Sequence, residues 1–249
     1  MQIKVNFSKR DGRLSVPKNY NHYLQAMIYN TIQNYEMKTM IHDQGYKSEK
    51  RVYRGFCFSG LQGKFYVDSK YLVFDNQVCL YISSYFTDFI QEVAQSFLEA
   101  DSVMIGNQKL YVEGVEILKK PDFKTVETVK VLSPFTLYST LEDIEKQIKT
   151  RYFYAPDHLH FAEQLRQNLV RKAMAVANKD LSDRELQIVL AEKVLPKQRR
   201  VIKYKNTNYV AWYTQLKLIG DPELKEIAYT TGLGSKNAVG FGFTQFVLQ

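Results

Sequence analysis

The order in which two hydrophobic periodicities alternate along the chain constrains its fold more than any other feature. Residues 3–7 alternate apolar and polar side chains, which is typical of a half-buried strand. Residues 20–35 instead repeat apolar side chains every three or four positions, which predicts a helix buried along one stripe. The rest of the first half contains strand-like runs, a second helical repeat and a last strand, at residues 52–59, 64–67, 71–75, 78–82, 86–98 and 108–118.

The second half of the chain repeats this order. Residues 129–138 are typical of a strand in which Pro134 lies at an edge or bulge. Asp157 is placed to cap a helix over residues 161–176. The remaining predicted elements are a hairpin, a short helix with proline in its first turn and a final strand, at residues 201–205 with 208–218, 222–230 and 239–248.

Two successive β-α-β-β-α-β units therefore account for the chain. Each is about as long as a ferredoxin-like domain, in which two helices pack on one face of an antiparallel sheet. The predicted class is α+β, with two tandem ferredoxin-like (RRM-like) domains and antiparallel sheets. Pro121 begins a short linker-like stretch, so we expect an N-terminal domain over residues 1–124 and a C-terminal domain over residues 125–249.

Composition limits the class of protein. The 249 residues are 45% hydrophobic and 24% charged, which is ordinary for a globular protein. No window approaches eighteen uninterrupted apolar residues and the first residues do not resemble a signal peptide, so we expect a cytoplasmic protein with no membrane association. The formal net charge of +8 favours an anionic partner, with nucleic acid first among the candidates.

Neither a metal nor a cofactor is expected. Cys57 and Cys79 are 22 positions apart in strand-like surroundings, which is not the spacing of a zinc site. Among the four histidines only His158 and His160 are close in sequence, and on a helix they would point about 200° apart.

A glycine-rich segment over residues 231–243 is the strongest local signal. It contains four glycines and one lysine: Gly232, Gly234, Lys236, Gly240 and Gly242. Because glycine lacks a Cβ, such a loop can bring backbone N–H groups against phosphate oxygens. A dinucleotide-binding loop needs a strand before it and a helix after it, which is the reverse of the predicted order, and no Walker A pattern is present. The alternative to phosphate binding is a purely structural role, in which the glycines form a tightly packed turn.

The segment 41–51 is polar and shows neither the alternation of a strand nor the three-to-four-residue repeat of a helix, so it is predicted to be a loop. His42 lies within it, and Lys47, Lys50, Arg51 and Arg54 follow closely. These cations are suited to holding a phosphodiester. The alternative is a solvated charged loop.

A basic run over residues 193–205 is the third signal. It has six basic and no acidic residues, among them Arg199, Arg200 and Lys203, and Tyr204 lies between them. Basic groups interleaved with aromatic rings favour RNA, whose phosphates need charge and whose unpaired bases stack. A soluble flexible loop is the simpler explanation.

Together these features resemble a known family. The tandem pattern, the His-Asp-Gln-Gly-Tyr sequence at residues 42–46, the Leu-Ser-Pro-Phe-Thr sequence at 132–136 and the glycine-rich segment are similar to the CRISPR-associated endoribonucleases that process precursor CRISPR RNA (the Cas six family of the RAMP superfamily). The resemblance spans nearly the whole chain. It implies metal-independent cleavage of CRISPR repeat RNA, in which the 2'-hydroxyl attacks the adjacent phosphate and leaves 2',3'-cyclic phosphate and 5'-hydroxyl ends.

The resemblance also implies roles for individual residues. His42 matches the family histidine and is suited to act as general acid or general base. Tyr29 is the best match for a tyrosine of the first helix and is predicted to lie off the apolar stripe, on the same row as His22, which is the alternative. Lys47 is nearest the spacing of the family's catalytic cation, with Lys50 as its competitor.

Two alternatives remain at this stage. A non-catalytic RNA-binding subunit of the same superfamily would share the glycine-rich segment and use His42 only for packing. A protein of the RNA-recognition-motif type is less favoured, because its characteristic strand sequence is not found.

Where many family members have Ser-Arg-Leu, residues 59–61 are Ser-Gly-Leu, which removes a basic contact. Other CRISPR effector subunits are candidate partners, and a monomer or homodimer is expected.

Overall fold

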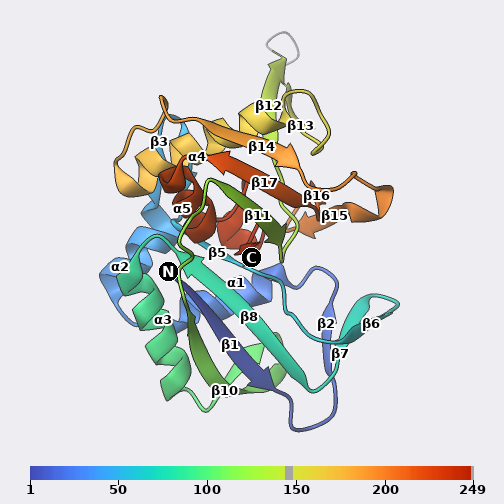
Figure 1. The fold of residues 1–249 in the computed structure, drawn as a ribbon. Coiled ribbons are helices and arrows are strands. Elements are labelled where there is room, and N and C mark those ends of the chain that lie inside the picture. Colours follow the sequence, from blue (N-terminus) through green and yellow to red (C-terminus); the bar gives the residue numbers. More distant parts are fainter. Residues whose placement is uncertain (144–147, 248–249) are drawn as a thin grey trace.

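The computed structural model describes residues 1–143 and 148–247. Its first half is built on a five-stranded antiparallel sheet in the order β5-β8-β1-β10-β9, with bounds Phe56–Phe58, Gln77–Ser84, Gln2–Ser8, Gln108–Leu118 and Ser102–Ile105. Helices α1 (Asn21–Thr31) and α3 (Thr87–Glu99) pack together beside this sheet (Figure 1). We call this half the N-terminal unit.

The second half, which we call the C-terminal unit, is built on a four-stranded antiparallel sheet. Its order is β14-β17-β11-β18, with bounds Leu186–Leu190, Gln215–Gly220, Val126–Val131 and Thr244–Phe246. Helices α4 (Phe161–Ala177) and α5 (Pro222–Thr231) pack on each other and against its strands. In both units the first strand lies between the third and fourth, which is the ferredoxin-like order, so the predicted fold class is confirmed.

Each sheet buries a separate hydrophobic core. In the N-terminal unit the apolar side chains of β1 (Ile3, Val5 and Phe7) pack in one cluster with the apolar stripe of α3. The strand alternation and the helical repeat in the sequence therefore predicted these buried faces correctly. In the described ranges 1–143 and 148–247, no helix combines the length and apolarity that crossing a bilayer requires.

Several hairpins are inserted between the core elements. The N-terminal unit carries β2 with β7 and β6 (Leu14–Pro17, Tyr71–Phe74 and Phe65–Asp68), and the C-terminal unit carries β12 with β13 (Tyr138–Asp143 and Ile148–Phe153). The basic run forms a two-stranded ribbon of β15 (Arg199–Tyr204) and β16 (Thr207–Trp212). Figure 1 shows the β6–β7 and β12–β13 hairpins extending away from the two sheets.

The prediction of a loop over residues 41–51 is wrong. After the short helix α2 (Tyr35–Thr39), residues 40–44 form one turn of π-helix, and β3 (Tyr46–Ser48) and β4 (Arg51–Tyr53) form a hairpin. The Gly45 N–H donates to the Met40 carbonyl at 2.6 Å. A hydrogen bond between residues five positions apart defines a π-turn. The ring of Tyr46 then stacks on Phe86 at 4.4 Å between centroids. Tertiary packing fixes elements that are too short to show a period.

The hairpin predicted at residues 201–205 with 208–218 is confirmed as β15 and β16, but it does not supply the middle strands of the second unit. The sequence placed residues 201–205 and 208–218 there, whereas the sheet uses β14 and β17, and only the end of the second run belongs to it. Asp157 does not cap α4, because a turn at residues 158–160 makes His160 the N-cap. The predicted strand 239–248 begins only at Thr244, after a 3-10 turn over residues 237–239, and residue 248 lies outside the described residues.

The glycine-rich segment of the C-terminal unit packs on the N-terminal unit. Asn21 Nδ2 of α1 donates to the Val239 carbonyl at 2.9 Å, and Gln25 Nε2 donates to the Ala238 carbonyl at 2.6 Å. Gly240 lies so close to the Phe58 ring of β5 that a Cβ there would be 2.7 Å from it. The segment therefore joins the two units, and the cleft described below lies at this junction.

Candidate active site

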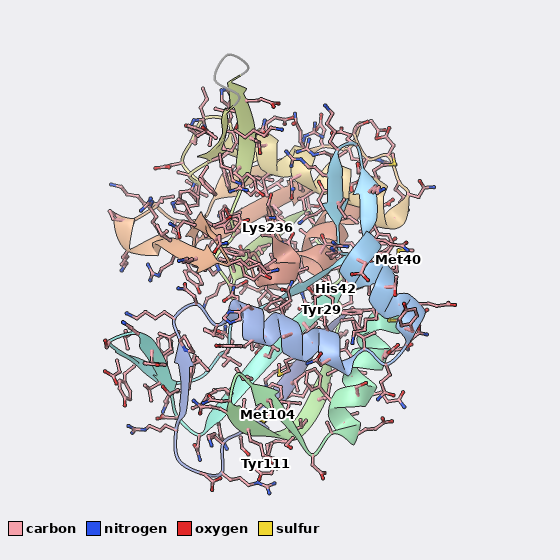
Figure 2. All side chains as sticks on the ribbon, turned by 180° about the vertical axis from the view of Figure 1, so that it is seen from behind. Tyr29, Met40, His42, Met104, Tyr111 and Lys236 are labelled. Atoms are coloured by element: carbon pink, nitrogen blue, oxygen red, sulfur yellow. The ribbon has the colours of Figure 1, made fainter. Side chains whose placement is uncertain are left out.

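A cleft of about 650 Å³ lies where the two units meet. The N-terminal unit contributes α1, His42, β4 and residues 54–56, and the C-terminal unit contributes β12, α4, the β15–β16 turn and the glycine-rich segment. Tyr29, His42, Arg51, Arg54 and Lys236, all singled out from the sequence, are among its wall residues. Figure 2 shows Tyr29 and His42 close together in the N-terminal unit, with Lys236 across from them.

His42 is oriented by its neighbour in the chain. Its Nδ1 lies 2.6 Å from Oδ1 of Asp43, and because an ionised carboxylate can only accept, Nδ1 carries the proton in this contact. The imidazole Nε2 is then left for another partner. The His42 side chain is 57% exposed, so it can reach a ligand in the cleft. A histidine held in this way can give or take a proton at Nε2.

Tyr29 supports the His42 ring. The two rings meet edge to face, with centroids 4.7 Å apart and planes at 84°, and Phe56 packs on Tyr29 at 5.7 Å. The sequence predicted Tyr29 off the buried stripe of α1, which is wrong, because the His42 turn and Phe56 cover it to 8% exposure. Burial raises the pKa of Tyr29 to about 12, and the positive charge of Arg54 partly opposes that rise. Its phenol is therefore protonated at neutral pH.

His22 lies outside the cleft. Its Nδ1 contacts the Asn19 carbonyl at 3.0 Å and its ring packs on Tyr23 with centroids 3.9 Å apart. Of the two side chains that the sequence left open, the structure brings only Tyr29 to His42.

The cations near His42 divide into two groups. Lys47 lies on β3 opposite Val52 and Lys50 lies in the turn of the same hairpin; both are exposed, and neither belongs to the cleft wall. Arg51 and Arg54 do line the cleft. In the described part of the chain, the buried Nη1 of Arg54 has no hydrogen-bond partner.

Gly45 makes the position of Arg54 possible. Its φ is +68°, a conformation that L side chains rarely adopt. A Cβ on Gly45 would lie 2.8 Å from Nη1 of Arg54 and 2.6 Å from Cγ1 of Val52. The glycine that ends the His42 turn therefore also lets the guanidinium approach it.

The glycine-rich segment is more tightly packed than the sequence suggested. Gly232, Gly234, Gly240 and Gly242 are buried with positive φ, and a Cβ on Gly242 would lie 2.0 Å from the Leu233 carbonyl oxygen. The N–H groups of Gly232, Gly240 and Gly242 donate to protein carbonyls at 3.0, 3.0 and 3.1 Å. These three amides are used inside the protein, so the expectation that they bind phosphate is corrected. The exposed group that the segment offers the cleft is Lys236.

The basic ribbon contributes its tip to the cleft. Tyr204 and Lys205 line the cleft, and the Tyr204 hydroxyl bonds to Gln25 of α1. Arg199, Arg200 and Lys203 are exposed along the ribbon and lie outside the cleft wall. The ribbon therefore extends the positive surface of the cleft, while three of its predicted RNA contacts lie beyond it.

Two wall residues on α4 were not singled out from the sequence. Asn168 and Lys172 are each 1% exposed. Lys172 Nζ donates to the Gly232 carbonyl at 2.6 Å, and burial lowers the pKa of Lys172 to about 7. The available signal was position: both residues interrupt the apolar stripe formed by Leu165, Leu169 and Val176.

The charge of the cleft is one-sided. Its described wall residues include four cationic side chains and no aspartate or glutamate; the cationic residues are Arg51, Arg54, Lys205 and Lys236. A concave surface with charges of one sign concentrates ligands of the opposite sign. Aromatic rings from Tyr29, Tyr53, Tyr138 and Tyr204 share the same walls. This combination suits a chain of phosphates that carries bases.

Comparison with known proteins identifies relatives along the whole chain. The family described as "CRISPR-associated protein Cas6, N-terminal" matches residues 15–116, and "CRISPR associated protein Cas6, C-terminal" matches residues 118–246. A Methanocaldococcus jannaschii protein named CRISPR-associated endoribonuclease Cas6 1 is 31% identical over 97% of this chain and 91% of its own length. A Pyrococcus furiosus protein named CRISPR-associated endoribonuclease Cas6 is 23% identical over 98% of this chain and 88% of its own length.

Solved structures agree. One described as CRISPR associated protein Cas6 has a TM-score of 0.80 and 25% identity over 100% of this chain and 99% of its own. A second structure is described as that of a Cas6-related gene from Pyrococcus furiosus. It has a TM-score of 0.85 and 18% identity, covers 99% of this chain and 98% of its own, and shows the shared fold. The resemblance seen in the sequence is therefore confirmed: the chain belongs to the CRISPR-associated Cas6 family.

Proposed function

We propose that this protein is a metal-independent endoribonuclease that cleaves CRISPR repeat RNA in precursor transcripts. The observation that supports it most is the convergence of His42, Tyr29 and Arg54 in one cationic cleft between the units. Relatives over nearly the full chain are named CRISPR-associated endoribonucleases, which agrees with this chemistry.

The reaction needs two proton transfers and one charge-stabilising group. The 2'-hydroxyl loses its proton and its oxygen bonds to the adjacent phosphorus. The bond from phosphorus to the 5'-oxygen breaks, and that oxygen takes up a proton. The products are a 2',3'-cyclic phosphate and a 5'-hydroxyl. His42 Nε2 performs one of the proton transfers as general acid or general base, because Asp43 already occupies Nδ1.

Tyr29 acts as a neutral hydrogen-bond donor in this proposal. A phenol with a pKa of about 12 is almost fully protonated at neutral pH, so it is a poor base there. Its hydroxyl is suited to donate to the attacked phosphate or to orient the 2'-hydroxyl. Its ring also holds the imidazole of His42 edge to face.

Arg54 is the proposed cation for the phosphorane. The resemblance implied a lysine at Lys47 or Lys50, but both lie outside the cleft wall, whereas Arg54 lies in it and has an unpartnered nitrogen among the described residues. A guanidinium offers donors in a fixed fork that matches phosphate geometry. Lys47 and Lys50 are then proposed to contact the RNA backbone beyond the cleft.

The RNA is proposed to run along the junction of the two units. Arg51, Lys205 and Lys236 neutralise phosphates inside the cleft, and the exposed ribbon residues Arg199, Arg200 and Lys203 extend the path. The buried glycines Gly232, Gly234, Gly240 and Gly242 contribute by shaping the segment that presents Lys236.

Metal independence follows from the proposed roles. The nucleophile belongs to the substrate, and the charge that grows on phosphorus is met by the side chains of the cleft. Among the wall residues that the structure describes, His42 is the only side chain of a type that commonly binds catalytic metals, and there is no carboxylate.

One incubation tests the proposal. Precursor repeat RNA is mixed with the protein in EDTA, and the product ends are analysed. We expect cleavage within the repeat with cyclic phosphate ends, and no cleavage of RNA that has a 2'-deoxy sugar before the scissile phosphate. Loss of activity in chelator, or cleavage of the deoxy RNA, contradicts the mechanism. Binding of the repeat without any cleavage favours the non-catalytic RNA-binding subunit instead.

A further inference from the structure

The wall of the cleft contains buried polar groups that the proposed chemistry does not use. Asn168 on α4 is 1% exposed, and neither Oδ1 nor Nδ2 has a hydrogen-bond partner among the described residues. The hydroxyl of Tyr53 on β4 is also buried without a partner among them. Helix α4 packs against β3 and β4, so these groups come from neighbouring elements, and both residues line the cleft.

Packing alone does not explain Asn168. Its neighbours along the same helical stripe are Leu165 and Leu169, so a leucine at position 168 would fit the sequence pattern. Burying an amide with neither donor nor acceptor satisfied is unfavourable compared with an apolar side chain of similar shape. An unpartnered amide in the wall of a cleft therefore points to a ligand that supplies both a donor and an acceptor.

The chemistry of the wall identifies the kind of ligand. The edge of a nucleobase presents donors and acceptors side by side, and an asparagine amide can bond to two of them at once. A phosphate offers only acceptors, which the Asn168 carbonyl oxygen would repel. The side-chain nitrogen of the nearby Lys172 already donates to the Gly232 and Thr231 carbonyls at 2.6 and 3.5 Å, so it is not a free phosphate-binding group. The Tyr138 ring in the same cleft offers a surface for stacking.

We propose that the wall formed by α4 and the β3–β4 hairpin is a pocket for one unpaired base of the bound RNA, whose edge is read by the Asn168 amide and the Tyr53 hydroxyl. This inference rests on the proposed RNA substrate and adds sequence selectivity to it. The base belongs to a nucleotide close to the scissile linkage, because the same cleft holds His42.

The test pairs a protein variant with removal of single bases. Repeat RNA with a 2'-deoxy sugar at the scissile position, which the protein binds without cleaving, is prepared with an abasic site at each position around that linkage in turn. Dissociation constants are measured for the wild type, Asn168→Leu and Tyr53→Phe. Gln167→Leu is the matched control, because Gln167 lies on the same helix and outside the cleft wall.

We expect one abasic position to weaken wild-type binding by about 5- to 150-fold, the range for a good bidentate contact to a base. Asn168→Leu should bind the intact RNA that much more weakly and should be insensitive to the abasic site at this one position. Tyr53→Phe should lose part of the effect at the same position. Gln167→Leu should behave as the wild type.

Three results with the variants overturn the inference. In the first, Asn168→Leu and Tyr53→Phe are weakened by each abasic site as much as the wild type is. In the second, Asn168→Leu weakens binding equally for every abasic position, as expected for a backbone contact or a water-filled wall. In the third, the two variants lose sensitivity at different positions. Tyr53→Phe decides the question alone if Asn168→Leu does not fold. A wild type that does not prefer repeat RNA over unrelated RNA overturns the proposed function and this inference with it, whereas base-independent binding of the repeat overturns the pocket alone.

Discussion

Replacing Tyr29 by phenylalanine tests whether this side chain acts as a base or as a neutral donor. Burial raises the pKa of Tyr29 to about 12, so at pH 8 only about one molecule in ten thousand carries the phenolate. A phenolate base would therefore make the cleavage rate rise tenfold per pH unit, from neutral pH up to about pH 12. A neutral donor predicts no such rise.

The size of the effect follows from the bond that is lost. Tyr29→Phe keeps the ring that packs on His42 and Phe56 and removes only the hydroxyl. A hydrogen bond to a charged group contributes about 1.5–3 kcal/mol, which corresponds to a rate loss of about 10- to 150-fold. We expect this loss to be the same at every pH. Tyr29→Ala should lose more, because it also removes the ring that supports the imidazole.

Single-turnover cleavage of repeat RNA between pH 6 and 10 measures both quantities, after subtraction of the hydroxide-driven background. Thermal unfolding of each variant is the control, because a buried aromatic side chain replaced by alanine costs about 3–5 kcal/mol of stability. The reasoning is refuted if the wild-type rate keeps rising tenfold per pH unit beyond pH 8 and this slope disappears in Tyr29→Phe.

Three further predictions concern other parts of the cleft. Arg54→Ala should slow cleavage by at least an order of magnitude more than Lys47→Ala or Lys50→Ala under single-turnover conditions, because only Arg54 lies in the cleft wall; equal losses would contradict this assignment. Gly242→Ala should prevent folding or destabilise strongly in denaturant titrations, because its Cβ would lie 2.0 Å from a backbone oxygen at a φ of +73°; near wild-type stability would contradict the packing. Burial lowers the pKa of Lys172 from 10.5 to about 7. Between pH 7 and pH 10.5 the unfolded chain therefore holds a proton on Lys172 that the folded chain has released. The free energy of unfolding consequently rises with pH over this range. Lys172→Met should flatten that rise in urea titrations at pH 7 and 10, and an unchanged slope would contradict the shift.

Hydrophobic periodicity predicted the layered core and the strands of the β6–β7 and β15–β16 hairpins, but not which strands join the two main sheets. The alternation in β1 and the repeats in α3 and α4 follow directly from burial on one face, so their positions could be read from the sequence. A strand-like run does not say which sheet it joins. The run that became β15 has the right pattern for a core strand, yet it pairs only with β16.

The site could be predicted in part. The sequence identified His42, Tyr29 and Arg54 as candidates, but their meeting in one cleft depends on the π-turn and on how the two units pack. Glycine spacing indicated an unusual backbone over residues 232–242, but it could not show that three of the amides bond inside the protein. Asn168 was detectable as a polar interruption of an apolar stripe, a signal that gains meaning only when the opposite wall is known.

Replacement of His42 tests the central claim most directly. Cleavage of repeat RNA in EDTA and binding of the 2'-deoxy RNA are measured for the wild type and His42→Ala, with His22→Ala as a matched control outside the cleft. The account predicts that His42→Ala binds as tightly as the wild type and forms cyclic phosphate ends at least about a hundredfold more slowly, while His22→Ala remains active. An unchanged cleavage rate in His42→Ala would contradict it.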